Sequence, residues 1–154
     1  MSKTALVTAT PLGPMTLVEA GGALAELRFG ETVLADERLQ STPLLRKAQA
    51  ELTEYFAGKR TAFTVPLAPQ GTAFQQAVWD ALLAIPYGET RSYGAVAGQI
   101  GKPKAARAVG MANNRNPLPV FIPCHRVIGA NGKMVGYGGG LHIKEALLAL
   151  ESAR

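Results

Sequence analysis

The hydrophobic pattern of the chain changes at the segment LAPQGT, residues 67–72, where proline and glycine cluster. Before it, residues 4–29 contain three short apolar runs separated by PLGP and AGG, which are turn signals between strands. After it, apolar residues recur at helical spacing. The first half thus has the hydrophobic pattern of strands, and the second half has that of helices. The 154-residue sequence therefore predicts two small units, residues 1–70 and 71–154.

The N-terminal half combines strands with a helix. We expect an antiparallel meander over residues 4–29 and one further short strand at AFTVPL, residues 62–67. Between them, STPLLRKAQAELTEYFAGK has a Ser/Thr cap, Pro43 in its first turn and Gly58 as a stop signal. Its apolar residues recur at helical spacing, which predicts an amphipathic helix.

The C-terminal half is predicted to be mostly helical. TAFQQAVWDALLAI is capped by Thr72 and has apolar residues at helical spacing. Two short helices follow, over residues 91–101 and about 103–113. A tight turn that contains glycine joins them, which resembles a helix-turn-helix. LHIKEALLALESA, residues 141–153, predicts a closing helix.

Charge is distributed unevenly between the two halves. Residues 1–70 carry seven Lys/Arg and seven Asp/Glu, whereas residues 71–154 carry nine Lys/Arg and four Asp/Glu. The whole net charge of +5 therefore belongs to the second half. Such an excess indicates a polyanionic partner, most simply nucleic acid. A purely solubilising role for the charge is the alternative.

Cysteine and histidine are scarce. The single cysteine, Cys124, excludes an internal disulfide framework, and with only His125 and His142 besides, we expect no metal site. The N-terminal segment has no apolar core of signal-peptide length, and no window approaches the roughly 18 apolar residues of a membrane span. We expect a cytoplasmic protein without membrane contact, in which the thiol stays reduced.

The segment VFIPCHRVIG places Cys124 directly before a His-Arg pair. A nucleophilic cysteine reacts as the thiolate, so its surroundings must help it to lose a proton. Adjacent residues of an extended segment point to opposite faces, so we expect Cys124 and His125 to communicate through a water, with a carboxylate orienting the imidazole. Inert packing is the alternative, because free cysteines are often simply buried.

The second helix of the helix-turn-helix is rich in small residues, with Arg107 the only large side chain among them. A major-groove reader needs Asn, Gln or Arg at several positions. Small residues with one arginine instead fit a narrow groove and a side chain that fills a gap in a base stack. The alternative is an alanine-rich helix that packs on a neighbour, with Arg107 solvated.

Three further residues are weaker candidates. Tyr137 lies in VGYGGG, whose glycines let backbone approach a ligand, but the run lacks Rossmann spacing and predicts no dinucleotide site. Lys144 and Glu151 belong to the closing helix, where most such charges are solvated.

Together these segments resemble the O6-alkylguanine-DNA alkyltransferases, also called methylated-DNA–protein-cysteine methyltransferases. PCHRVIG is similar to the reactive-cysteine motif of that family, and residues 72–151 follow its segments in order and spacing. Residues 1–70 resemble the N-terminal lobe of its bacterial members. The resemblance implies an α+β fold: a ribonuclease-H-like lobe with an antiparallel sheet and a helix, and a mostly helical lobe with the helix-turn-helix and the reactive cysteine.

The resemblance also implies an activity, direct-reversal DNA repair. Cys124 would accept the alkyl group of O6-alkylguanine irreversibly, so each molecule would react once and need no cofactor. His125 would take the thiol proton through a water, Glu151 would orient the imidazole, and Asn116 would brace the turn. A non-catalytic, alkyltransferase-like lesion-binding protein is the alternative, against which the presence of Cys124 argues.

The implied partner is double-stranded DNA, bound through its minor groove with the damaged base flipped out. Arg107 would fill the space that the flipped base leaves in the base stack. Tyr93 would crowd the DNA phosphate and donate a hydrogen bond to guanine N3. The residues implied at the DNA are Ser92, Tyr93, Ala105, Ala106, Arg107 and Gly110. Those implied around the base are Met111, Pro119, Val135, Tyr137, Gly138 and Lys144. We expect a monomer; cooperative binding, larger alkyl groups and O4-alkylthymine stay open.

The chain departs from the family pattern in three ways. Residues 1–70 lack the Cys and His that bind zinc in vertebrate members. Gly138 stands where many relatives carry Ser or Ala after the pocket tyrosine. The segment MANNRNP, residues 111–117, stands where the family has a glycine-rich segment. We expect this difference to place Asn113 and Arg115 near the DNA.

Overall fold

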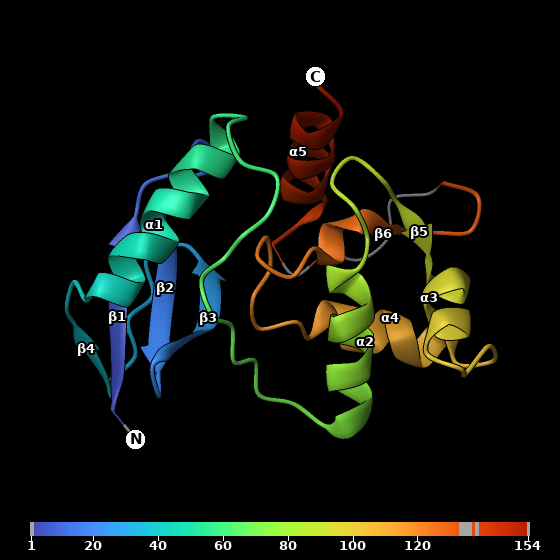
Figure 1. The fold of residues 1–154 in the computed structure, drawn as a ribbon, viewed down its shortest axis with the longest axis horizontal. Coiled ribbons are helices and arrows are strands. Elements are labelled where there is room, and N and C mark those ends of the chain that lie inside the picture. The colour runs from blue at the N-terminus through green and yellow to red at the C-terminus, as the bar shows by residue number, and fades with distance from the viewer. Residues whose placement is uncertain (1, 133–136, 138, 154) are drawn as a thin grey trace. The chain divides into compact units, whose positions relative to one another are not determined.

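The computed structural model describes residues 2–132, 137 and 139–153 (Figure 1). The chain divides into two compact units, Met1–Gln70 and Gly71–Arg154. Over its described residues, the first contains a mixed sheet and one α-helix, and the second contains four α-helices and a two-stranded pair. The predicted α+β fold class is thus confirmed. Among the described residues, no helix has the length and apolar character needed to span a membrane.

The N-terminal unit is built on a four-stranded sheet in the order β3-β2-β1-β4 (Figure 1). The predicted antiparallel meander is formed by β1 (Lys3–Thr8), β2 (Met15–Ala20) and β3 (Ala23–Phe29). The short strand β4 (Glu37–Leu39) pairs in parallel with β1, so the sheet is mixed rather than wholly antiparallel. Three residues are too few to show a strand period, and the sequence therefore does not predict β4.

Helix α1 (Pro43–Phe56) lies across this sheet and contacts its three long strands (Figure 1). The hydroxyl of Thr42 caps it by accepting a hydrogen bond from the backbone N–H of Leu45 at 3.1 Å. One apolar stripe of α1 is buried: Leu45, Ala48, Leu52 and Tyr55. The helix therefore forms as its capping and spacing predict.

Residues 62–67 do not form the predicted strand. Their pairing is limited to one bridge with Leu24, whose N–H donates to the carbonyl of Pro66 at 2.8 Å. Pro66 has no N–H with which to extend a ladder. The buried carboxylate of Glu51 on α1 holds this segment instead, and it accepts from the backbone N–H of Thr64 at 2.9 Å.

Three helices pack against one another in the C-terminal unit: α2 (Ala73–Leu83), α3 (Tyr93–Gln99) and α4 (Ala106–Asn114). Thr72 and Gln75 form a reciprocal capping box at the start of α2. The buried Trp79 of α2 donates from Nε1 to the carbonyl of Ala112 at 2.9 Å, which ties α2 to α4.

Two short elements bring distant segments together around the cysteine. A 3₁₀ turn, η1 (Cys124–Arg126), contacts α2 and the closing helix α5 (Leu141–Ser152). Strand β6 (Val127–Ile128) follows it and pairs in parallel with β5 (Arg91–Ser92), which directly precedes α3. The cysteine turn is thereby linked to the start of the helix pair.

Candidate active site

The predicted reactive cysteine lies in a buried turn. Cys124 is 4% exposed and begins η1. Its backbone N–H donates to the carbonyl of Ile122 at 2.7 Å, and that of Arg126 donates to Pro123 at 3.0 Å. The expected extended segment is therefore wrong. Consecutive side chains of a 3₁₀ turn are still separated by about a third of a turn, so Cys124 and its neighbour do not face one another.

Two asparagines, one in the last turn of α4 and one just after the helix, hold the segment that contains this turn. Asn116 donates from Nδ2 to the carbonyl of Ile122 and accepts at Oδ1 from the N–H of Leu118, both at 2.9 Å. Asn113 donates from Nδ2 to the carbonyl of Cys124 itself at 3.3 Å. The backbone of the cysteine turn is thus fixed from the helix-turn-helix side.

A buried ionic cluster lies behind the cysteine. Nε2 of His125 lies 2.7 Å from Oε2 of Glu151, and both side chains are almost wholly buried. Arg126 donates to the same carboxylate from Nε at 2.8 Å and from a terminal nitrogen at 2.9 Å. Its other terminal nitrogen donates to the carbonyl of Ile85 at 2.6 Å. Glu151 is therefore not the solvated charge that its place late in the helix predicts.

This cluster fixes how the imidazole is protonated. Because the carboxylate of Glu151 accepts at Nε2, neutral His125 carries its proton there and leaves Nδ1 as an acceptor. Nδ1 is buried and has no hydrogen-bond partner among the described residues. Burial lowers the pKa of His125 below 6.5, although Glu151 acts in the opposite direction. The ring is neutral at pH 7 and can accept a proton at Nδ1.

The thiol is held in its protonated form. Burial raises the pKa of Cys124, whereas hydrogen bonding by Asn116 and Tyr137 and the positive charge of Lys144 lower it. The pKa stays above its ordinary value because burial is the largest effect. Nucleophilic attack by this sulfur therefore needs a base, and the neutral His125 is the neighbouring group that can serve.

Lys144 is wholly buried, contrary to the expectation that it is solvated. Its Nζ donates to the carbonyl of Val127 at 2.6 Å, directly after the cysteine turn. Burial lowers the pKa of Lys144, and the charge of Cys124 acts against that shift. Lys144 and Glu151 are seven residues apart on α5, so one face of this helix supplies both charges.

Tyr93 lies where the helix pair meets. It begins α3, and its ring is close to α4: a Cβ added to Gly110 would lie 3.8 Å from two ring carbons. Burial raises the pKa of Tyr93, and the negative charge of an ionised Cys124 adds to the effect. The hydroxyl of Ser92 caps α3 and accepts from the N–H of Ala95 at 3.0 Å.

Helix α4 has an exposed and a buried face. Arg107 is exposed, and Met111, one turn later, is 60% exposed. The predicted small residues Ala105, Ala106 and Gly110 are partly exposed. Asn113 is on the buried face of α4, whereas Arg115 is exposed.

The remaining predicted pocket residues are only partly described. Pro119 is buried next to the asparagine-held segment. Tyr137 is partly exposed, with its hydroxyl buried. Val135 and Gly138 lie outside the described residues.

Three residues of the site were not predicted from the sequence: Tyr87, Val120 and Arg126. Arg126 completes the ionic cluster, and its guanidinium lies 5.7 Å from the ring centroid of Tyr87. The His-Arg pair was the available signal for Arg126. Val120 has a φ of 75°, a left-handed conformation that is rare for a β-branched residue. No sequence pattern points to that conformation.

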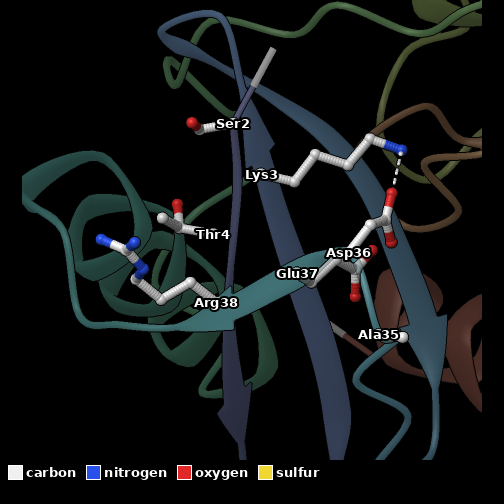
Figure 2. Close-up of a pocket in the computed structure, with 7 residues that line it drawn as sticks. All are labelled: Ser2, Lys3, Thr4, Ala35, Asp36, Glu37 and Arg38. Atoms are coloured by element: carbon white, nitrogen blue, oxygen red, sulfur yellow. Dashed lines mark ion pairs between the residues drawn. The ribbon is translucent and has the colours of Figure 1, made fainter.

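A separate polar pocket of about 340 Å³ lies in the N-terminal unit, beside the parallel β1–β4 pair (Figure 2). Three of its charges have partners: Lys3 forms an ion pair with Asp36 at 3.6 Å, and Glu37 is bound by Arg28. No sulfur or imidazole lines it. Within the part of the chain that is described, no group of three His, Cys, Asp or Glu side chains could hold a metal ion.

Both units match family models. Residues 73–153 match the 6-O-methylguanine DNA methyltransferase, DNA binding domain, and residues 5–69 match the ribonuclease-like domain of the same proteins.

Individual relatives match almost the whole chain. The methylated-DNA–protein-cysteine methyltransferase of Mycobacterium bovis is 54% identical over 148 residues, which cover 94% of this chain and 90% of the relative. That of Methanosarcina acetivorans is 50% identical over 148 residues, covering 94% and 95%. The crystal structure of Mycobacterium tuberculosis OGT in complex with DNA has a TM-score of 0.91 and 51% identity, covering 97% of this chain and 93% of that one.

Proposed function

This chain belongs to the 6-O-methylguanine DNA methyltransferase family, and we propose that Cys124 is the acceptor to which it transfers an alkyl group from damaged DNA. The protein is a methylated-DNA–protein-cysteine methyltransferase, a DNA-repair enzyme whose partner is DNA. The observation that carries the proposal is the buried Cys124 directly before His125, whose Nε2 is held by Glu151 and whose Nδ1 has no hydrogen-bond partner among the described residues.

The transfer is an in-line displacement. The sulfur of Cys124 attacks the alkyl carbon bonded to guanine O6, so a C–S bond forms and the C–O6 bond breaks. Its proton passes through a water to Nδ1 of His125, where Glu151 stabilises the resulting imidazolium. The guanine leaves with the bonding electron pair and takes up one proton from water at N1, while the His125 imidazolium returns its proton to water, so protons balance. A thioether remains on Cys124, and no step restores the thiol, so each molecule reacts once.

The exposed face of α4 supports base flipping from the minor groove. A base must leave the stack before its O6 substituent can reach a buried sulfur. Arg107 is the one long cationic side chain among small residues on that helix, so we assign it to the space that the base vacates. Tyr93, which packs beside Gly110, donates to guanine N3. Ser92, Ala105 and Ala106 lie along the DNA.

The pocket that receives the base is assigned to residues around the cysteine turn. Tyr137 supports the thiolate and covers the base, Asn116 braces the turn, and Lys144 holds the segment after it. Met111, Pro119, Val135 and Gly138 complete the wall in this proposal. We infer that a monomer acts on O6-alkylguanine in a compartment that keeps the thiol reduced, as the cytoplasm does.

Intact-protein mass tests the central claim. We expect wild-type protein mixed with a duplex that contains O6-methylguanine to gain one methyl group and no more. The Cys124→Ser variant should gain none while still binding the duplex. Methyl transfer to the Ser variant, or repeated turnover by the wild type, would exclude Cys124 as the acceptor.

A further inference from the structure

The buried guanidinium of Arg126 joins the closing helix to the segment that follows α2. Its Nε and one terminal nitrogen bind the two carboxylate oxygens of Glu151 on α5, at 2.8 and 2.9 Å. The other terminal nitrogen donates to the carbonyl of Ile85 at 2.6 Å, and the ring of Tyr87 lies 5.7 Å from the guanidinium carbon. The planar fork of an arginine makes this set of bonds, whereas a lysine presents a single point charge.

Stability alone does not account for this buried ion pair. Apolar residues of similar volume can often replace such a pair without loss of stability, because two charges must leave water to form it. Arg126 directly follows His125 in the cysteine turn, and both residues bind the same oxygen of Glu151, Oε2. The pair is therefore placed to act on His125.

The first effect of Arg126 is on orientation. A carboxylate that is bound through one oxygen can rotate about its last bond, whereas one that is bound through both oxygens is fixed. Arg126 binds both oxygens of Glu151, which holds Oε2 at 2.7 Å from Nε2 of His125. The imidazole is then held with Nε2 donating and Nδ1 available as the acceptor, as proton transfer from a thiol requires.

The second effect of Arg126 is on charge. The charged groups that face His125 are Glu151 and Lys144 of α5 and Arg126 of its own turn, and the neutral groups beside them are Cys124 and Tyr87. Helix α2 also contacts the turn, but its one ionisable side chain, Asp80, is exposed. The positive charge of Arg126 acts with burial to lower the pKa of His125, and Glu151 acts against both. Without Arg126, the carboxylate would favour an imidazolium, which has no acceptor left for the thiol proton.

We propose that Arg126 is a positioning residue for the transfer, which holds the Glu151 carboxylate against Nε2 of His125 and keeps the imidazole neutral until the thiol proton arrives. The inference rests on the proposed function, because the proton that His125 accepts is the one that Cys124 loses during methyl transfer. Nδ1 takes up that proton while Nε2 stays bound to Glu151, and Arg126 keeps its own protons throughout.

Two substitutions separate the two effects: Arg126→Lys keeps the positive charge but loses the fork, and Arg126→Gln loses both. Single-turnover methyl transfer from a duplex with O6-methylguanine is measured at saturating protein from about pH 4 to 8, the range in which histidine titrates. Each rate is divided by the folded fraction that circular dichroism gives at the same pH. We expect Arg126→Lys to lower the plateau rate by about 10- to 100-fold and to keep the acid midpoint of the wild type. Arg126→Gln should lower the plateau at least as much and raise the midpoint by about one pH unit or more.

The matched control is Arg46, an exposed arginine of α1. Arg46→Lys and Arg46→Gln should keep the wild-type plateau and midpoint. A merely structural role for Arg126 changes the folded fraction but neither the rate per folded molecule nor the midpoint, and that result overturns the proposal. A wild-type midpoint in Arg126→Gln overturns it as well.

If neither variant folds, nitrogen-15 NMR of the wild type decides. We expect His125 to be neutral at pH 7 with its proton on Nε2, and the Nε–H of Arg126 to exchange with solvent more slowly than that of Arg46. An imidazolium at that pH, or equally fast exchange, overturns the proposal. Absence of methyl transfer to the wild type at every pH shows instead that the proposed function itself is wrong, because these NMR signals do not depend on transfer.

Discussion

A single buried carboxylate, that of Glu151, holds the two side chains that follow the cysteine. It accepts from His125 and, through two nitrogens, from Arg126. Removing one partner from a buried ionic cluster leaves the others without compensation. The same group therefore orients the proposed base and stabilises the C-terminal unit.

We expect Glu151→Gln to lower the free energy of unfolding by about 3–5 kcal/mol, because Arg126 would keep its buried charge without an opposite one. Denaturant unfolding measures the change. Glu145→Gln is the matched control: it lies on the same helix and is exposed, so it should change stability by less than about 0.5 kcal/mol. Similar effects of the two substitutions would show that the cluster does not stabilise the fold.

The lowered pKa of His125 predicts how the reaction depends on pH. The folded protein keeps the ring neutral below pH 6.5, its ordinary pKa, whereas the unfolded chain takes up a proton there. Stability due to this residue is therefore complete above about pH 6.5 and declines as the pH falls toward the folded-state pKa. We expect the single-turnover rate of methyl transfer to keep its plateau through pH 6.5 and to decline only below it. An acid midpoint at or above 6.5 would contradict the proposed role of a buried neutral base.

At the scale of elements, the two faces of α4 have different roles. Its buried face ties α2 and the cysteine turn together through Ala112 and Asn113, whereas its exposed face carries Arg107. Changes on the exposed face should therefore affect DNA steps without altering the chemistry at Cys124.

Arg107→Ala is expected to slow transfer from duplex DNA at saturating protein by roughly 10- to 100-fold, because the vacated stack is no longer filled. Transfer from free O6-methylguanine base, which needs no flipping, should change little. Single-turnover kinetics on both substrates measure the difference. Arg115→Ala is the control, since loss of one exposed charge should weaken binding without lowering the saturated rate. Equal slowing on duplex and free base would remove the stack-filling role.

The helices could be predicted from the sequence, but the pairing of the short strands could not. The N-terminal caps and apolar spacing predict α1 and α2 closely, because these signals are local. Strands β4, β5 and β6 are two or three residues long and pair with distant partners, which leaves no local pattern. The strand predicted over residues 62–67 does not form, because Pro66 has no N–H to donate to a neighbouring strand.

The chemistry of the site was predictable only in part. The motif around Cys124 points to its neighbours, but local patterns cannot show that Lys144 and Glu151 are buried, since charged residues late or early in a helix are usually solvated. Their seven-residue spacing placed them on one helix face and was the usable signal. The left-handed Val120 and the unpaired Oδ1 of Asn113 depend on tertiary packing and required the structure.

For the whole molecule, the reaction itself should change stability. A methyl group on Cys124 adds volume to a site that is 4% exposed, and overpacking a core costs about 1–3 kcal/mol. We expect the methylated protein to melt about 2–10 °C below the unreacted protein. Differential scanning calorimetry before and after stoichiometric transfer measures this shift. An equal or higher melting temperature would show that the pocket accommodates the methyl group without strain.

The protonated, buried state of Cys124 has a consequence for how long a molecule remains usable. Peroxides and disulfides consume exposed thiolates, and a cysteine lost to sulfenic acid can no longer accept an alkyl group. A protein that reacts once gains nothing from a permanently reactive sulfur, because every side reaction removes one repair event. Low exposure and a raised pKa slow such losses, so the number of intact molecules follows the damage encountered rather than their age.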